Sequence, residues 1–269
     1  MTVFCDTHAH LDFDSFDADR ELVIERARTN GLQFIINIAI DLESSHKSLA
    51  LARQYPGTIF STVGIHPNYS SDLEETTFTM LEELAVQPEV VAIGEIGLDY
   101  YRDYAAPPQQ MRALEVQLDL AQRLELPIVV HERSSAQELV PVLTDWHKKL
   151  PASSLLKLNP GVMHAFSADL GYVEPLLDCG FCFGIGGPVT YKNASDKRVL
   201  VSLLPLGNML LETDCPFMPP QAHRGQRNEP SFIPLIAQKI AEIRGITVEE
   251  VGNQLTSNAR RLFVRQENR

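Results

Sequence analysis

Short apolar segments rich in β-branched residues alternate with longer segments of helical periodicity along the whole sequence. This alternation is typical of repeated βα units, which build a parallel sheet covered by helices. One closed barrel of eight such units takes about 250 residues, close to the 269 residues of this chain. We therefore predict an α/β fold, a single (β/α)8 TIM-type barrel, with strands at Val3–His8, Gln33–Ile40, Ile59–His66, Val90–Gly97, Pro127–His131, Gly161–Ala165, Phe181–Gly186 and Asn208–Asp214.

The sequence predicts one domain, covering residues 1–269. No glycine-, proline- or serine-rich linker, low-complexity tract or block of charge interrupts the alternation. A doubly wound open sheet would show a similar pattern, but polar residues at nearly every strand end favour a closed barrel. After the eighth unit, Thr247 to Phe263 predicts an additional C-terminal helix, with Thr247 as N-cap and Glu250 at the capping-box position.

The acidic composition limits the classes of partner. A net charge of −12 argues against a protein that coats duplex DNA, because such binding depends on many Lys and Arg contacts with phosphates. Bound cations would reverse the local field, so a small phosphodiester or a strand end stays open as a substrate. The N-terminus lacks a secretory pattern, and no apolar run approaches the roughly 18 residues that span a bilayer. We expect a cytoplasmic protein with no membrane association and no obligate protein partner.

Four cysteines are too few for a disulfide scaffold and fit a reducing compartment. Cys179 and Cys182 form a CGFC motif. Redox CxxC motifs open a helix, whereas this one closes a predicted helix and enters a strand. We interpret both cysteines as structural.

Ionisable side chains gather at the carboxyl ends of the predicted strands. His8 and His10 are two residues apart, so both project from one face of a strand, and Val91, Ile93 and Glu95 share a face in the same way. Barrel enzymes place their chemistry at this end. Since buried ionisable groups need partners or a metal ion, we predict a metal site from this set: His8, His10, His66, Glu95, His131, His164 and Asp214.

The ligand chemistry favours a binuclear hydrolytic centre. Mixed imidazole and carboxylate ligands suit Zn, Mn or Fe, and a carboxylate can bridge two ions. Two ions roughly 3.5–4 Å apart would activate a water molecule and stabilise the oxygens of an in-line displacement. The sequence has no GxSxG elbow, and Cys215 precedes Pro216 at a strand exit, so no covalent nucleophile is indicated.

Weaker candidates flank these residues. Glu212 has the inward parity of Asp214 and would bind a further ion or orient a ligand. His66 would contact a phosphate or a metal-bound water, or simply be a polar residue at the end of the third strand. Arg224, on the loop after the last strand, would bind a phosphate or remain a solvated charge.

Two loop features have structural alternatives. Asp99, followed on the same loop by Tyr101, would cap the next helix or orient a ligand. The glycines that end the seventh strand would form a tight turn or let backbone N–H groups approach a phosphate, with the turn favoured; they are Gly184, Gly186 and Gly187.

Six segments carry a family resemblance over essentially the whole chain, namely FCDTHAHLD, VGIHP, AIGEIGLDYY, PIVVHERS, GVMHAFS and LLETDCPFMPP. In this order and spacing they resemble the TatD family of metal-dependent hydrolases. The segments FGIGGPVTYKNAS and LETDCPFMPPQAHRGQRNEP resemble its YjjV-like branch. The resemblance implies a (β/α)8 barrel, dependence on divalent metal and hydrolysis of phosphodiesters of the deoxyribonuclease type.

Position by position, the resemblance also implies roles for the residues. One ion would be held by His8, His10, Glu95 and Asp214, and the other by Glu95, His131 and His164, with Glu95 as the bridge. Asp214 would also accept the proton of the attacking water. His66 and Glu212 match further functional positions, and no expected ligand is substituted.

These observations support three hypotheses. The first is a hydrolase with two divalent ions per subunit (Zn, Mn or Mg) that cleaves DNA, as a deoxyribonuclease or 3′–5′ exonuclease, or a small phosphodiester. The second is an amidohydrolase-like enzyme acting on an amide, lactone or phosphotriester, although such barrels often bridge their ions with a modified lysine on strand four, where this chain has Glu95. The third is a non-catalytic barrel that retains metal structurally.

Overall fold

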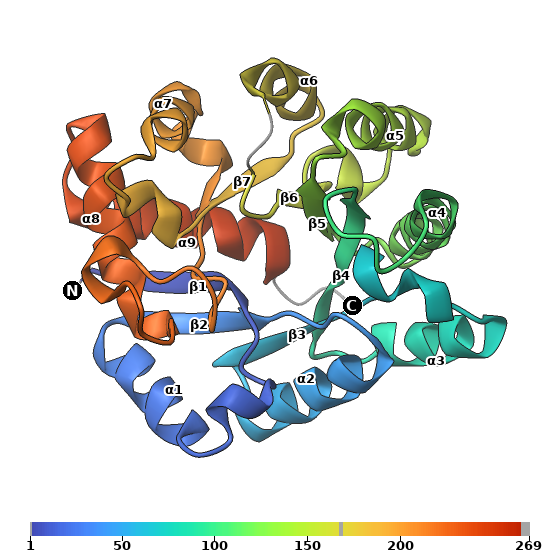
Figure 1. Ribbon diagram of the computed structural model, residues 1–269, viewed down its shortest axis with the longest axis horizontal. Helices are drawn as coiled ribbons and strands as arrows, with labels where there is room; N and C mark the ends of the chain where they lie inside the picture. The colour runs from blue at the N-terminus through green and yellow to red at the C-terminus, as the bar shows by residue number, and fades with distance from the viewer. Residues whose placement is uncertain (1, 167–168, 265–269) are drawn as a thin grey trace.

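Eight parallel strands form one sheet in the order of the sequence, in a computed structural model that describes residues 2–166 and 169–264 (Figure 1). The sheet closes on itself. An Ala9–Cys215 bridge joins its two ends, with hydrogen bonds from His10 N to Cys215 O (2.9 Å) and from Asp214 N to His8 O (2.8 Å). The strands are β1 (Phe4–Ala9), β2 (Leu32–Asn37), β3 (Ile59–Val63), β4 (Val90–Asp99), β5 (Ile128–Arg133), β6 (Gly161–Met163), β7 (Cys182–Ile185) and β8 (Met209–Leu211).

The helices surround the strands, as Figure 1 shows, so the predicted (β/α)8 barrel is confirmed. None of the described helices is both long and apolar enough to cross a membrane. Their bounds are α1 (Arg20–Thr29), α2 (Leu42–Gln54), α3 (Glu75–Ala85), α4 (Pro107–Leu124), α5 (Ala136–Lys149), α6 (Val173–Asp178), α7 (Ser195–Leu203), α8 (Ile233–Arg244) and α9 (Val248–Phe263).

Several strands are shorter than the sequence predicts. His66, His164 and Asp214 lie one to three residues beyond the last residues of β3, β6 and β8. These polar side chains therefore belong to the loops at the mouth of the barrel, by which we mean the opening at the carboxyl ends of the strands. Loops at this end are where barrel enzymes vary their chemistry on a constant frame.

The parity prediction for the fourth strand is wrong at Ile93. Val91 and Ala92 pack in the cluster inside the barrel, whereas Ile93 packs in the cluster between sheet and helices. The ladder between β4 and β5 is irregular from Ile93 to Ile96, and an irregularity of this kind changes which side chains face inward. Glu95 nevertheless reaches the mouth, through this irregularity.

Helix α9 closes the end of the barrel opposite the mouth. Leu262 and Phe263 pack with Phe34 and other inward residues of the strands. The predicted capping box is present: Thr247 Oγ1 accepts from Glu250 N (3.1 Å), and Glu250 Oε2 accepts from Thr247 N (2.8 Å). The predicted additional C-terminal helix is thus part of the core that supports the strands.

All four cysteines are buried and unpaired. Cys179 follows the end of α6, and Cys182 begins β7, as the sequence analysis expected. Burial raises the pKa of Cys182 above its ordinary value and that of Cys5 to about 12. Thiols held in the neutral form are poor nucleophiles, which agrees with a structural role.

Replacing Leu262 should destabilise the barrel without touching the mouth. Leu262 is almost fully buried inside the barrel, so Leu262→Ala should lower the free energy of unfolding by about 2–5 kcal/mol. Denaturant titration would measure it. Leu203→Ala, on the exposed surface of α7, is the matched control and should change stability by less than about 0.5 kcal/mol; equal losses in both variants would contradict a core role for α9.

Candidate metal centre

The mouth of the barrel holds three overlapping groups of metal-binding side chains. Within each group one ligand atom per residue lies within 4.8 Å of the others. The groups are His8–His10–Glu95, His8–His164–Asp214 and His66–Glu95–His131. All six predicted metal ligands, and His66, belong to at least one of them.

In the first group, imidazole nitrogens and a carboxylate oxygen converge on one point. His8 Nε2 lies 3.2 Å from His10 Nε2 and 3.4 Å from Glu95 Oε2. Ligands bound tetrahedrally at about 2.0–2.2 Å stand roughly 3.3–3.6 Å apart, so these separations fit a shared ion. His10 is oriented by its Nδ1, 2.9 Å from Ile38 O, which directs Nε2 towards the site.

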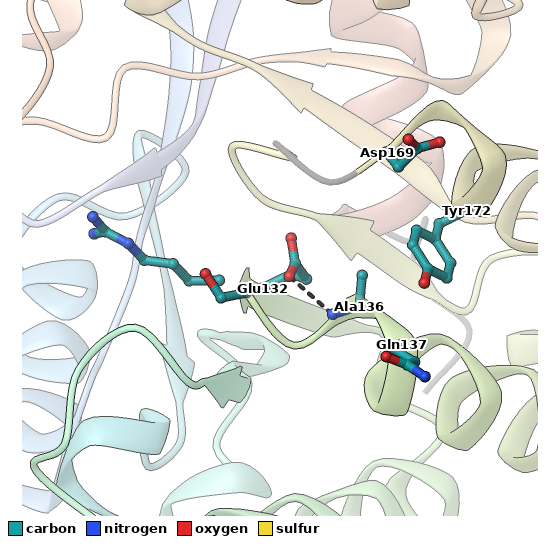
Figure 2. A pocket seen from close by; sticks show the side chains of 7 residues that line it. Glu132, Ala136, Gln137, Asp169 and Tyr172 are labelled. Carbon is teal, nitrogen blue, oxygen red and sulfur yellow. Dashed lines mark hydrogen bonds between the residues drawn. The ribbon is translucent and has the colours of Figure 1, made fainter.

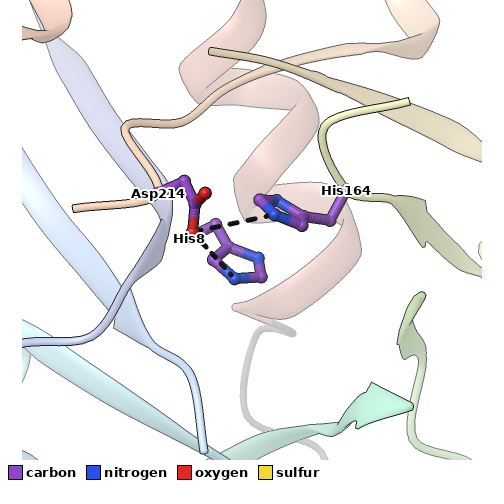
Figure 3. A group of neighbouring side chains, drawn as sticks. All are labelled: His8, His164 and Asp214. Carbon is purple, nitrogen blue, oxygen red and sulfur yellow. Dashed lines mark ion pairs between the residues drawn. The ribbon is translucent and has the colours of Figure 1, made fainter. Parts of the chain in front are cut away.

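The second group lies on the side of β6 and β8. The His8 and His164 rings stack with centroids 3.4 Å apart. Asp214 Oδ1 lies 3.9 Å from His8 Nε2 and 3.8 Å from His164 Nε2, and Figure 3 shows its carboxylate facing both rings. The same oxygen is 3.5 Å from His10 Nε2, so Asp214 links the first two groups.

The third group lies on the side of β3 and β5. Glu95 Oε1 is 2.8 Å from His131 Nδ1 and 3.8 Å from His66 Nε2. Glu95 therefore presents one oxygen to His8 and the other to His131, which is the arrangement that a bridging carboxylate requires. His164 belongs to the group of His8 and Asp214 and not to that of Glu95 and His131.

His66 differs from the other histidines in its hydrogen bonding. Its Nδ1 accepts from Asn68 N (3.1 Å), so the proton of the neutral ring is on Nε2, the atom that faces Glu95. Burial lowers the pKa of His66 to about 3. His66 is thus a neutral donor at the mouth.

Burial and mutual attraction set the charges of the centre. Burial acts to raise the pKa of Glu95, but His8, His66 and His131 outweigh it and hold that pKa well below its ordinary value. Burial acts to lower the pKa of His131 and of His164, but neighbouring carboxylates outweigh it. Asp99 and Glu95 raise the pKa of His131 to about 9. Glu212 and Asp214 raise the pKa of His164 to about 10. Without a bound metal ion, both rings carry a proton at neutral pH.

Two carboxylates outside the predicted ligand set orient the histidines. Asp99 Oδ2 lies 3.3 Å from His131 Nε2, and Glu212 Oε2 lies 3.1 Å from His164 Nδ1. Asp99 does not cap α4, whose N-cap is Ala106. The predicted loop position of Asp99 is wrong, because Asp99 is the last residue of β4 and pairs with Arg133 of β5.

Gly184 makes room for Glu212. A Cβ at Gly184 would lie 1.8 Å from Glu212 Oε2, closer than any contact that atoms tolerate. Glu212 is fully buried, and its Oε1 accepts from Ala165 N (2.8 Å). Gly184 is required by a carboxylate of the site, a reason that neither the tight-turn nor the phosphate interpretation included.

Asp6, which shares the parity of His8, is a functional residue outside the predicted set. This buried carboxylate accepts from His8 N (3.1 Å) and from Thr213 N (3.0 Å), and so ties β1 to the segment after β8. It thereby fixes the backbone that carries His8 and Asp214.

Arg224 lies on the surface at the end of the short helix Gln221–His223. Its guanidinium stacks over the Tyr191 ring at 4.5 Å. Among its described contacts none is with a residue of the metal centre, and a phosphate-binding role for Arg224 stays a prediction.

Comparison with known proteins places this centre in a family. The family model described as "TatD related DNase" matches residues 5–264. The chain belongs to the TatD family. Its relatives include an uncharacterized metal-dependent hydrolase, YabD, of Bacillus subtilis, 36% identical, with 96% of this chain and 98% of YabD aligned.

A further relative and a solved structure also belong to the TatD family. A protein of Erwinia tasmaniensis named 3′–5′ ssDNA/RNA exonuclease TatD is 36% identical over 96% of this chain and 98% of its own length. The crystal structure of YjjV, a TatD homologue from Escherichia coli, superposes with a TM-score of 0.89 at 34% identity, covering 98% of each chain. The resemblance to TatD proteins of the YjjV-like branch is confirmed, and the chain is a member of a family of metal-dependent hydrolases.

A side chain at position 184 should disturb the metal centre through Glu212. Gly184→Ala should displace Glu212 and release His164, lowering metal affinity by about 10–100-fold, as loss of a ligand-orienting group does. Titration calorimetry with Mn²⁺ would measure the change. Gly207→Ala, where a Cβ meets nothing within 4 Å, is the control; equal affinity in the two variants would contradict the orienting role of Glu212.

Metal binding should release protons. Because the pKa values of His131 and His164 are about 9 and 10, an ion that binds these rings displaces a proton from each, and its apparent affinity should fall as pH is lowered. From pH 8 to pH 7 we expect a decrease of about 10-fold per proton displaced. Calorimetry in two buffers of different ionisation enthalpy counts the protons; a count of zero at pH 7 would refute the assigned charges.

Proposed function

We propose that this TatD protein is a metal-dependent phosphodiesterase that hydrolyses DNA at strand ends, as a 3′–5′ exonuclease, by attack of a metal-activated water. The observation that carries the proposal is Glu95, whose two oxygens face separate groups of histidines. Such a donor set suits the two-ion chemistry of phosphodiester hydrolysis. The exonuclease name of the Erwinia tasmaniensis relative supports the substrate.

The proposed ion sites follow the family pattern. We assign His8, His10, Glu95 and Asp214 to one ion and Glu95, His131 and His164 to the other, with Zn, Mn or Mg as the metal. The assignment of His164 to the second ion is the part of this division that most needs a test. The contacts of His164 are with His8, Asp214 and Glu212, and not with Glu95 or His131. When bound, the ions would lower the pKa of the attacking water and stabilise the charge that develops on the phosphate oxygens.

The side chains would handle the proton and the substrate. Burial acts to raise the pKa of Asp214, but His164, His10 and His8 lower it below its ordinary value, so Asp214 is ionised and able to accept the proton of the water. His66 would donate its Nε2 proton to a phosphate oxygen. Glu212 holds His164 in place, and Arg224 would neutralise a phosphate further along the strand.

Removing the base or the shared ligand should abolish hydrolysis. Asp214→Asn and Glu95→Gln keep the shape of the side chains but remove the charge, and each should lower kcat by at least about 100-fold. The assay is release of nucleotides from 3′-labelled single strands by Mn²⁺-loaded protein. Asp145→Asn, on the exposed surface of α5, is the control and should retain full activity.

A substrate panel separates this proposal from other metal hydrolases. Single-stranded DNA and RNA, a small phosphodiester, a lactone and an amide would be tested with the same Mn²⁺-loaded protein. Metal-dependent hydrolysis of the lactone or amide, without cleavage of any phosphodiester, would refute the proposed function.

A further inference from the structure

Exposed or partly exposed aromatic rings lie on two sides of the metal centre. On the side of β1 and β8, Phe13 and Phe217 form what we call the phenyl platform; their centroids are 6.1 Å apart. On the side of β3 and β4, Tyr69, Tyr101 and Tyr104 form the tyrosyl platform. Tyr101 and Tyr104 are 64% and 63% exposed, and Phe217 is 50% exposed. Large exposed rings that gather at a site mark a binding surface more than scattered ones do.

The phenyl platform adjoins a predicted metal ligand. The His10 ring stacks on Phe13 at 4.8 Å and lies 6.3 Å from Phe217. The backbone of Phe217 is held on both sides: its N–H donates to Asp214 O (2.8 Å), and its carbonyl accepts from Asn228 Nδ2 (2.6 Å). A half-exposed ring on so firmly held a backbone is preorganised for a planar partner.

The tyrosyl platform is joined to the opposite side of the centre. The Tyr69 ring lies 6.3 Å from that of His66. Asp99, which contacts His131, also accepts from Tyr101 N (2.9 Å) and Arg102 N (3.0 Å) through its other oxygen. The loop that carries Tyr101 is thus anchored to the carboxylate that orients His131.

Two arginines add positive charge to the tyrosyl platform. The Arg133 guanidinium stacks over Tyr101 at 4.0 Å, and Arg102 lies 5.8 Å from the centroid of Tyr104. Within the described part of the chain, neither arginine forms a salt bridge with a carboxylate. In a chain of net charge −12, unpaired arginines among exposed rings favour a ligand with both phosphates and planar bases.

A pocket continues from this platform along the mouth. It measures about 450 Å³ and is lined by Arg133 and by residues of the loops after β5 and β6. Figure 2 shows Glu132 turned to the backbone of Ala136, with Asp169 and Tyr172 at the far side. A pocket of this size has room for a group as large as a nucleotide.

The topology places the two platforms opposite one another. In a closed sheet ordered β1 to β8, the segment after β8 is four strands away from the loop after β4. The metal centre lies between them, since it takes His8 from β1 and Glu95 from β4.

We propose that the phenyl and tyrosyl platforms stack the bases on the two sides of the scissile phosphate, and so select an unpaired strand. This proposal rests on the proposed phosphodiesterase function. Stacking on both platforms requires the bases to be separated from each other and from a complementary strand. In a duplex, the faces of the bases are already covered by their neighbours.

Binding, measured without hydrolysis, tests the platforms. The probe is a short phosphorothioate DNA strand, followed by fluorescence anisotropy on Mn²⁺-loaded, full-length protein. Phe217→Ala and Tyr101→Ala should each weaken binding by about 5–100-fold, the usual loss for one stacked base, while Phe217→Trp should retain it. Leu158→Ala, a 79% exposed apolar residue ahead of β6, is the matched control.

A strand without bases separates stacking from other effects. For an abasic phosphorothioate strand, wild-type protein should bind weakly, and Phe217→Ala should change nothing further. Equal losses for normal and abasic strands, or no loss in either alanine variant, would overturn the proposal. So would a blunt duplex that binds as tightly as the single strand.

The outcomes also separate this proposal from the proposed function. If the normal strand binds with the predicted dependence on Phe217 and Tyr101 but no phosphodiester is hydrolysed, the platforms stand and the nuclease proposal fails. If single strands are hydrolysed with an unchanged KM in both alanine variants, the nuclease proposal stands and the platforms fail.

Discussion

Mutual neutralisation of buried ionisable groups is the interaction on which the mouth of this barrel depends. Glu95 and Asp214 would each be costly to bury alone, yet each lies within 4 Å of histidine nitrogens that hold its pKa down. The histidines are stabilised in turn by Asp99 and Glu212. Removing one member leaves an uncompensated charge. Cations at the centre would take the place of the protons that the rings carry without them, which is why the same arrangement suits metal binding.

The frame of the site could be predicted from the sequence because strand alternation and polar strand ends are local patterns. His8, His10, His131 and His164 follow apolar segments in register with the barrel, and the structure brings all of them to the mouth. The capping box of Thr247 and Glu250 is equally local, and the structure reproduces it. The family resemblance added what spacing lacks, namely the division of the ligands between two ions, and that division stays a prediction.

What could not be predicted depends on contacts between distant segments. The ladder between β4 and β5 is irregular from Ile93 to Ile96, so a strict alternation misassigned Ile93. The pairing of His164 with Glu212, and the space that Gly184 leaves for it, join the loops after β6 and β8 to strand β7. Asp99 reaches His131 only because β4 and β5 are neighbours. Such interactions have no signature within one segment.

The seam between β1 and β8 has a consequence for the order in which the chain is made. His8 and His10 leave the ribosome first, whereas Asp214 and the Cys215 backbone that closes the barrel against Ala9 come some two hundred residues later. A nascent chain therefore exposes the two histidines long before the carboxylate that completes their group exists. The group of His8, His164 and Asp214 can therefore assemble only after the segment that follows β8 has been synthesised and has paired with β1.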